Sequence, residues 1–183
     1  MPEHDQGANR GPVLLILCGL PFAGKTALAV ELAQTLEGAA HIEIDAINTA
    51  RGLGIDAAPI TPMEWSDTYR ISYERIEDAL AQGQDVIYDA TNYSRAQRDI
   101  LRATGRRKGA ENAVIFVDVP VEEARRRWLA NRESGELPDM PDEDFERVVN
   151  RFDPPGADEL VLLFYPGMGV ADLVSGIRQV FGR

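Results

Sequence analysis

The residues best suited to chemistry lie in a glycine-rich segment near the start of the chain, Gly19-Leu-Pro-Phe-Ala-Gly24-Lys25-Thr26. This segment matches the pattern G-x-x-x-x-G-K-S/T, in which the backbone N–H groups of a tight loop point at phosphate oxygens. The lysine ammonium then contacts the outer phosphates, and the hydroxyl of the last residue ligates Mg²⁺. We therefore predict a binding site for ATP and Mg²⁺ made of Gly19, Leu20, Pro21, Phe22, Ala23, Gly24, Lys25 and Thr26.

Two aspartates follow short apolar segments further along the chain. Asp45 comes after His41-Ile-Glu-Ile44, and Asp89 comes after Val86-Ile-Tyr88. An aspartate at the carboxyl end of a parallel strand lies at the edge where such sheets bind their ligands. We expect Asp89 to orient Mg²⁺ and Asp45 to accept a proton from an attacking hydroxyl. The alternative for each is a turn former or a helix cap, which explains most aspartates at strand ends.

Several polar residues could contact a second substrate or the transferred phosphate. Asn92 could hydrogen-bond the substrate, and Arg95 and Arg98 could either touch it or face solvent. An arginine brought over the γ-phosphate by a closing lid would neutralise charge and exclude water. The default alternative is a solvated helix face. Four arginines are candidates for this role: Arg125, Arg126, Arg127 and Arg132.

The apolar segments and turns predict strands that alternate with helices. We expect strands at 13–18, 41–44, 86–88, 113–119 and 160–164, and helices at 25–37, 61–82, 94–108, 121–133, 142–152 and 170–181. Residues 46–60 are expected to form a loop that includes about one helical turn. This alternation indicates a three-layer α/β sandwich, with a five-stranded, mainly parallel sheet and helices on both faces. The helical spacing of Trp65, Tyr69 and Tyr73 favours core packing over an aromatic stacking platform.

The charge and hydrophobicity of the sequence argue against a nucleic-acid-binding protein and against a membrane protein. The formal net charge of −11 disfavours non-specific binding to nucleic acid. No apolar run approaches the roughly 18 residues that span a bilayer, so we expect no membrane contact and a cytoplasmic location.

Residues 1–12 are expected to be a disordered tail, and 13–183 to be one domain. Cys18 is expected to be a reduced core residue, and two histidines without paired cysteines argue against a zinc site.

The chain resembles the P-loop kinases of the polynucleotide kinase-like group, which overlaps with the chloramphenicol phosphotransferase-like kinases. The resemblance covers about 13–152 and rests on Gly19–Thr26, Asp45, Asp89-Ala-Thr-Asn92 and Val119-Pro120 before an arginine-rich helix. The segment Arg151-Phe-Asp-Pro-Pro155 is similar to one in uncharacterised ATP-binding members.

This resemblance implies the P-loop NTPase fold, with a small helical lid at about 125–152. It also implies that Lys25 and Asp45 are catalytic, with Asp45 as general base, and that Arg127 and Arg132 reach the phosphates from the lid. The polynucleotide kinases carry an arginine three residues after the base, where this chain has Asn48. We expect Asn48 to lie on the acceptor side, and its identity argues against a polynucleotide acceptor.

One activity is favoured and two alternatives remain open. We expect an ATP-dependent kinase that transfers the γ-phosphoryl group to a hydroxyl of a small-molecule or nucleoside-like acceptor. The first alternative is a kinase for the 5′-hydroxyl of a polynucleotide. The second is a regulatory switch that hydrolyses ATP and signals through a partner. Residues 46–60 are long enough to form either an acceptor lid or a switch loop.

Overall fold

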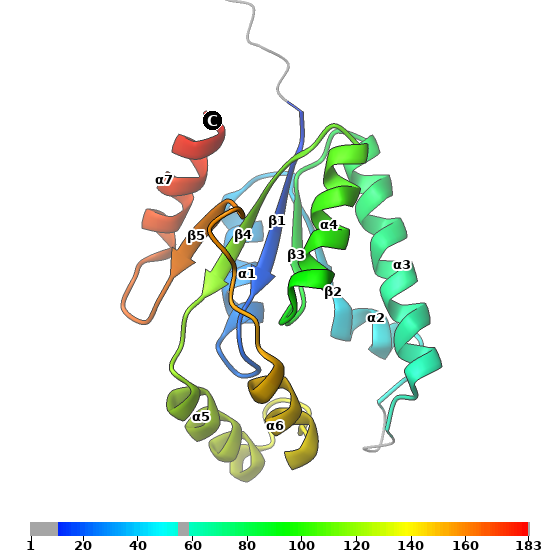
Figure 1. Cartoon of the computed structure of the whole chain (residues 1–183), viewed down its shortest axis with the longest axis vertical. Helices are drawn as coiled ribbons and strands as arrows, with labels where there is room; N and C mark the ends of the chain where they lie inside the picture. The colour runs from blue at the N-terminus through cyan, green and yellow to red at the C-terminus, as the bar shows by residue number, and fades with distance from the viewer. Residues whose placement is uncertain (1–10, 55–58, 183) are drawn as a thin grey trace, which may run out of the picture.

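A parallel sheet of five strands forms the centre of the fold (Figure 1). The computed structural model describes residues 11–54 and 59–182. The strands lie in the order β2-β3-β1-β4-β5, and each of these pairings is parallel. The predicted α/β fold is therefore confirmed. The strand bounds are β1 Val13–Cys18, β2 Ala40–Glu43, β3 Val86–Asp89, β4 Glu111–Val117 and β5 Val161–Phe164.

Helices cover both faces of the sheet and one of its ends (Figure 1). Their bounds are α1 Lys25–Thr35, α2 Ile44–Ala50, α3 Pro62–Ala81, α4 Arg95–Arg107, α5 Val121–Ser134, α6 Asp142–Arg151 and α7 Val170–Phe181. Helices α1 and α7 pack on one face, and α3 and α4 pack on the other. Helices α5 and α6 lie beyond the carboxyl ends of the strands, where Trp128 stacks on Phe145 at 4.4 Å.

Strand β1 shows why the sheet requires helices on both sides. All six of its residues are buried, as its continuous apolar sequence predicts. Leu15 and Leu17 belong to the core under α1 and α7, whereas Leu14 and Ile16 belong to the core under α3 and α4. The strand is thus held in the middle of the molecule, and its carboxyl end leads directly into the glycine-rich segment.

Two helices begin as their sequences predict. Thr61 caps α3 and Ser94 caps α4, each in a complete capping box with Glu64 and Gln97 respectively. Within 11–54 and 59–182, no helix has the combined length and apolar character required to cross a membrane.

The segment after β2 differs from its prediction. β2 ends at Glu43, and Ile44 already begins the seven-residue helix α2. Asp45 therefore lies in the first turn of a helix rather than at the end of a strand, and the segment holds more helix than the single turn expected. Residues 55–58 of the predicted loop, and 1–10 of the predicted tail, lie outside the described residues.

Candidate functional site

The glycine-rich segment forms a tight turn between β1 and α1, and both of its glycines are required by geometry. Gly24 has φ of +96° at the N-cap of α1, a conformation that side chains rarely adopt. A Cβ atom on Gly19 would lie 2.8 Å from the backbone oxygen of Val117, too close for any other residue. The N-terminus of α1 follows at once, so its free N–H groups face the space in front of the turn.

Lys25 is buried at the base of this turn. Its Nζ donates a hydrogen bond of 2.7 Å to the backbone oxygen of Leu20. Burial lowers the pKa of Lys25 to about 8, although the charges of Asp89, Cys18 and Asp45 act against this change. Lys25, Asp89 and Asp45 therefore lie within electrostatic range of one another. Thr26 follows Lys25 and is exposed.

Asp89, at the end of β3, is almost fully buried, with 3% of its surface exposed. Its Oδ2 lies 3.5 Å from Nε2 of His41, and this carboxylate is the main reason that the pKa of His41 is raised. Glu43 is the register partner of Asp89 on β2, and burial raises its pKa, with the charge of Asp89 adding to the effect. Sequence reasoning overlooked His41 and Glu43, although their i, i+2 spacing on a strand places them on one face.

Asp45 is exposed at the surface, on the first turn of α2. The protein around its carboxylate limits hydration, which raises its pKa; Asp89 adds to this rise, and Lys25 and the Asn48 amide oppose it. Oδ1 of Asn48 accepts a hydrogen bond of 2.6 Å from Thr68 on α3. Nδ2 of Asn48 is buried and has no hydrogen-bond partner in the described part of the chain. The structure thus places Asn48 next to Asp45, on the side of α3.

The two arginines expected on the phosphates occupy different positions. Nη1 of Arg127 donates to the backbone oxygen of Ala23 at 3.1 Å, so this side chain contacts the glycine-rich turn directly. The Arg132 guanidinium instead pairs with Asp139 and Asp142 in the segment before and at the start of α6, and lies 4.3 Å above the ring of Trp128. In this structure the contact with the turn comes from Arg127 and is not made by Arg132.

Two residues predicted to contact substrate, Asn92 and Arg95, bind other parts of the chain in this structure. Asn92 is 2% exposed, and its Nδ2 donates to the backbone oxygen of Leu17 at 2.6 Å. The Arg95 guanidinium pairs with Asp99 and Asp158. The amide of Asn92 holds the turn after β3 against β1, and the guanidinium of Arg95 is paired with two carboxylates, so the substrate contacts expected of both residues stay predictions.

Arg98, which was expected to touch the acceptor or face solvent, does neither. It is fully buried, and its Nε and Nη2 donate to the two carboxylate oxygens of Glu159 at 2.9 and 3.0 Å. Its Nη1 donates to the backbone oxygens of Asn92 and Asp153. Arg98 therefore ties α4 to the turn after β3 and to the segment before β5. Cys18 is buried beside it, as predicted, and burial raises the pKa of its thiol to about 11.

A cavity of about 200 Å³ lies beside the glycine-rich turn. It is mainly apolar, and it is bounded by the turn, α1 and the connection from β5 to α7. The side chains that give it this character include Leu28, Val119, Phe164, Tyr165 and Pro166, with Arg127 at its edge.

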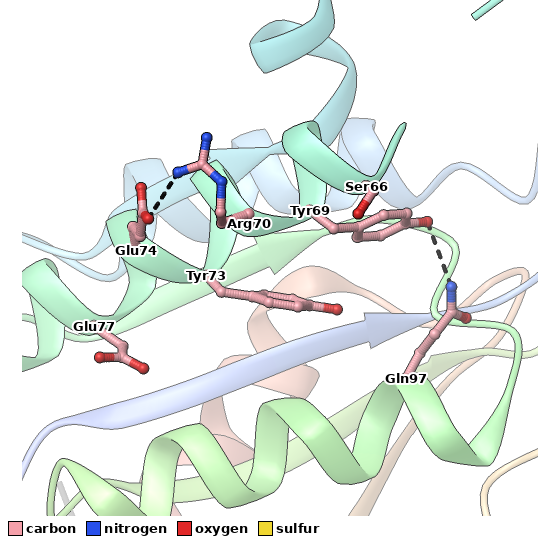
Figure 2. Close-up of a pocket in the computed structure, with 7 residues that line it drawn as sticks. All are labelled: Ser66, Tyr69, Arg70, Tyr73, Glu74, Glu77 and Gln97. Atoms are coloured by element: carbon pink, nitrogen blue, oxygen red, sulfur yellow. Dashed lines mark hydrogen bonds and ion pairs between the residues drawn. The ribbon is translucent and has the colours of Figure 1, made fainter. Parts of the chain in front are cut away.

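A larger groove of about 470 Å³ lies between α3 and α4 (Figure 2). The rings of Tyr69 and Tyr73 extend from α3 toward α4, and Tyr69 Oη accepts a hydrogen bond of 3.4 Å from Nε2 of Gln97. Both tyrosines are partly exposed, so the core packing predicted for them is incomplete. Burial raises the pKa of Tyr69 to about 12, and Asp45 is close enough to contribute to this rise. Tyr69, which lines the groove, therefore lies within electrostatic range of Asp45.

Comparison with known proteins places this architecture in a family. Residues 14–155 match the family described as AAA domain. Protein kti12 of Schizosaccharomyces pombe is 28% identical over 152 residues, which cover 78% of this chain and 52% of that protein. L-seryl-tRNA(Sec) kinase of Methanococcus maripaludis is 27% identical over 145 residues, which cover 79% of this chain and 54% of that protein. The chain thus spans about half the length of these relatives.

Solved structures of other proteins superpose on this chain and share its fold. Kti12 of Chaetomium thermophilum, in complex with ADP-AlF3, superposes with a TM-score of 0.70 at 23% identity, covering 93% of this chain and 96% of that chain. A chain of the Pnkp1/Rnl/Hen1 RNA repair complex superposes with a TM-score of 0.66 at 22% identity, covering 80% of this chain and 45% of that chain. The resemblance to P-loop kinases is therefore confirmed for family and fold.

Proposed function

The chain belongs to the AAA domain family, and from this premise we propose that it is an ATP-dependent phosphotransferase with an alcohol acceptor. It would transfer the γ-phosphoryl group to a hydroxyl of a small-molecule or nucleoside-like compound. The observation that carries the proposal is the meeting of Lys25, Asp45 and Asp89 at one glycine-rich turn, each within electrostatic range of the others. A phosphate donor, a metal and a hydroxyl acceptor each require one of these groups.

ATP would bind across the turn at Gly19–Thr26. The backbone N–H groups of the turn and of the first turn of α1 would bind the phosphates, with Lys25 beneath them. The apolar cavity next to the turn is suited to the base, since it offers Phe164 and Tyr165 to a flat ring. The structure of Kti12 in complex with ADP-AlF3, which has the same fold, supports nucleotide binding by this chain.

The residues present fit a magnesium ion. Asp89 Oδ2 is buried and lacks a hydrogen-bond partner in the residues described, which suits it to a cation. Thr26, which follows Lys25 in the glycine-rich turn, is exposed. Thr26 and Asp89 would hold Mg²⁺, directly or through water. When bound, Mg²⁺ would neutralise charge on the β- and γ-phosphates.

Asp45 would accept the proton of the attacking hydroxyl. The acceptor oxygen forms a bond to the γ-phosphorus, the bond from that phosphorus to the bridging oxygen breaks, and ADP leaves. The raised pKa of Asp45 makes its carboxylate a stronger base than an ordinary aspartate, which suits it to this transfer. Arg127 would stabilise charge on the phosphates from its contact with the turn. Asn48, whose amide interacts with the Asp45 carboxylate, would orient this base.

The groove of Figure 2 is the best candidate for the body of the acceptor. It offers two phenol rings for stacking, and the amide of Gln97 for hydrogen bonding. Tyr69 lies within electrostatic range of Asp45, and we propose that a planar molecule in the groove extends a hydroxyl toward this base. This combination suits a nucleoside-like acceptor, because aromatic rings and an amide together recognise a heterocyclic base.

A second candidate is a kinase that acts on a hydroxyl carried by RNA. The likeness to L-seryl-tRNA(Sec) kinase and to the RNA repair complex favours it. The net charge of −11 opposes it, because phosphate backbones are bound mainly by basic surfaces.

Incubation with γ-labelled ATP separates these functions. The chain would be given three acceptor sets: nucleosides, other small alcohols and 5′-hydroxyl oligonucleotides. We expect label in the first or second set, and no label with Lys25→Ala. Label found only in oligonucleotides would favour the RNA alternative. Label released only as free phosphate, at a rate that no acceptor changes, would overturn phosphotransfer and favour an ATP-hydrolysing switch.

The groove has its own test. Tyr73→Ala should raise the KM for the acceptor at least about fivefold while the KM for ATP stays constant, since a stacked base is stabilised by about 1–3 kcal/mol. Tyr73→Phe keeps the ring and should behave as the parent. Equal KM values for the acceptor in the parent and Tyr73→Ala would exclude the groove as its binding site.

A further inference from the structure

Three potential metal ligands gather where β2 and β3 end. His41 and Glu43 come from β2 and Asp89 from β3. In the parallel pairing Glu43 lies opposite Asp89, and His41 precedes Glu43 by two residues, so all three side chains lie on the same face of the sheet. One ligand atom from each residue lies within 4.8 Å of the other two. The cluster borders the nucleotide site but extends away from it along β2.

Two atoms of this cluster are incompletely satisfied. Nε2 of His41 and Oδ2 of Asp89 are both buried, and neither has a hydrogen-bond partner among residues 11–54 and 59–182. They are 3.5 Å apart, which is long for a hydrogen bond. Buried polar groups are normally satisfied, so a pair of such atoms facing each other requires an explanation.

The separation of these two atoms suits a shared metal ion. Zinc binds imidazole nitrogen and carboxylate oxygen at about 2.0–2.2 Å, and two such ligands at a tetrahedral angle lie roughly 3.4 Å apart. The distance of 3.5 Å between Nε2 and Oδ2 is close to this value. A cation between them would satisfy both atoms, and Glu43 would supply a third ligand.

We propose that His41, Glu43 and Asp89 form a binding site for a divalent transition-metal ion. The ion would bind to this site in the absence of nucleotide. The imidazole distinguishes this site from the magnesium position proposed at Thr26 and Asp89, since Mg²⁺ prefers oxygen ligands and keeps its waters. The sequence-based expectation against zinc considered only paired cysteines and histidines. Two strands here supply a mixed nitrogen and oxygen set that such spacing does not reveal.

The site shares Asp89 with the proposed function but does not depend on it. A metal ion held by His41, Glu43 and Asp89 would compete with Mg²⁺ for the Asp89 carboxylate. The proposal predicts that Zn²⁺ lowers phosphotransfer at subsaturating Mg²⁺, and that this inhibition requires His41. Binding of Zn²⁺ is measured without ATP, so its failure would leave the proposed phosphotransfer untouched.

Calorimetric titration of the metal-free chain with Zn²⁺ tests the site. We expect one Zn²⁺ bound per chain, at least tenfold more tightly than Mg²⁺. His41→Gln should weaken Zn²⁺ binding at least tenfold, and so should Glu43→Gln. The matched control is His4→Gln, which removes the other histidine of the sequence and should leave binding unchanged. Circular dichroism of each variant establishes that it is folded.

Zinc X-ray absorption spectroscopy supplies an independent readout. Nitrogen and oxygen neighbours alone are expected, and a sulfur neighbour would assign the metal to Cys18 and overturn the proposal. The proposal would also be overturned by the absence of saturable Zn²⁺ binding, or by equal Zn²⁺ affinity in the parent and a folded His41→Gln variant.

Discussion

Asp45 combines access to solvent with an environment that raises its carboxyl pKa. A general base must be deprotonated to accept a proton, so the rate should fall as the pH drops through this raised pKa. We predict that Asp45→Asn lowers kcat by about 10²–10⁴-fold and removes this acidic limb of the pH profile. The affinity for ATP should change little, since no phosphate contact is assigned to Asp45. Fixed-time assays of labelled product at several pH values measure kcat and its pH profile. Calorimetry measures the affinity for ATP.

The comparison variant for Asp45 is Asp99→Asn. Asp99 is an exposed carboxylate on α4 that pairs with Arg95 and Arg102, away from Lys25. It should keep the parent kcat and pH profile. Transfer by Asp45→Asn at a rate near that of the parent would remove Asp45 as the base.

Arg127 and Arg132 provide a second contrast between single residues. Arg127 pairs with Glu123 and also contacts the backbone of the glycine-rich turn, whereas the partners of Arg132 are Asp139, Asp142 and the ring of Trp128. Arg127→Ala should lower kcat/KM for ATP at least about tenfold, because a cation beside the transferred phosphate is lost. Arg132→Ala should change it less than about threefold. Equal losses in steady-state assays would instead mean that both arginines reach the phosphates, as the lid proposed at 125–152 requires.

At the scale of elements, local sequence predicted helix starts better than it predicted the ends of strands. Thr61 and Ser94 cap their helices through hydrogen bonds to residues three positions away, so the signal lies within one turn. The end of β2 is different, because its last residue depends on the register with β3. Ile44 is apolar and suits either state. The position of Asp45 on a helix could therefore not be read from residues 41–45 alone.

The buried position of Arg98 also could not be predicted from local sequence. Its carboxylate partner, Glu159, is 61 residues away in the sequence, and no local pattern links them. Both side chains are buried, so removal of one leaves a buried, unpaired charge. We predict that Glu159→Ala lowers the free energy of unfolding by about 3–5 kcal/mol. Chemical denaturation followed by circular dichroism measures this change.

The control for this ion pair is Arg147→Ala. Arg147 pairs with Asp144 on the exposed face of α6, and such surface pairs contribute about 0–1 kcal/mol. If Glu159→Ala costs no more than Arg147→Ala, the Arg98–Glu159 pair does not stabilise the contact of α4 with the segment before β5.

For the whole molecule, the fold could be predicted because each strand and helix carries its own periodicity, and a phosphate-binding motif marks the end of the first strand. The position of a candidate site residue could be predicted only where the residue belongs to that motif or follows a strand, as with Lys25 and Asp89. Asn92 and Arg95 have similar positions in the sequence, yet Leu17 and Asp158 bind them in the folded chain. Whether a polar side chain stabilises the fold or is available to a ligand depends on partners from distant segments of the chain, which local sequence does not reveal.

Lys25 connects the site to the stability of the whole chain. Its pKa is lowered from 10.5 to about 8, so the folded state holds this proton less tightly than the unfolded state. Below pH 8 both states are protonated, and the buried charge costs the folded chain up to roughly 3 kcal/mol. Between pH 8 and 10.5 the unfolded state binds more protons, so stability rises with pH and the cost disappears.

Lys25→Met should therefore raise the free energy of unfolding at pH 7 by up to roughly 3 kcal/mol while it abolishes ATP binding. The difference from the parent should shrink toward zero as the pH approaches 10.5, the ordinary value for lysine. Denaturant titrations of both proteins at several pH values isolate this contribution, because other titrating groups are common to the two chains. A variant that is less stable than the parent at pH 7 would mean that the hydrogen bond of Lys25 to Leu20 stabilises the turn by more than the burial of its charge destabilises it. The phosphate site would then be built at no cost to the fold.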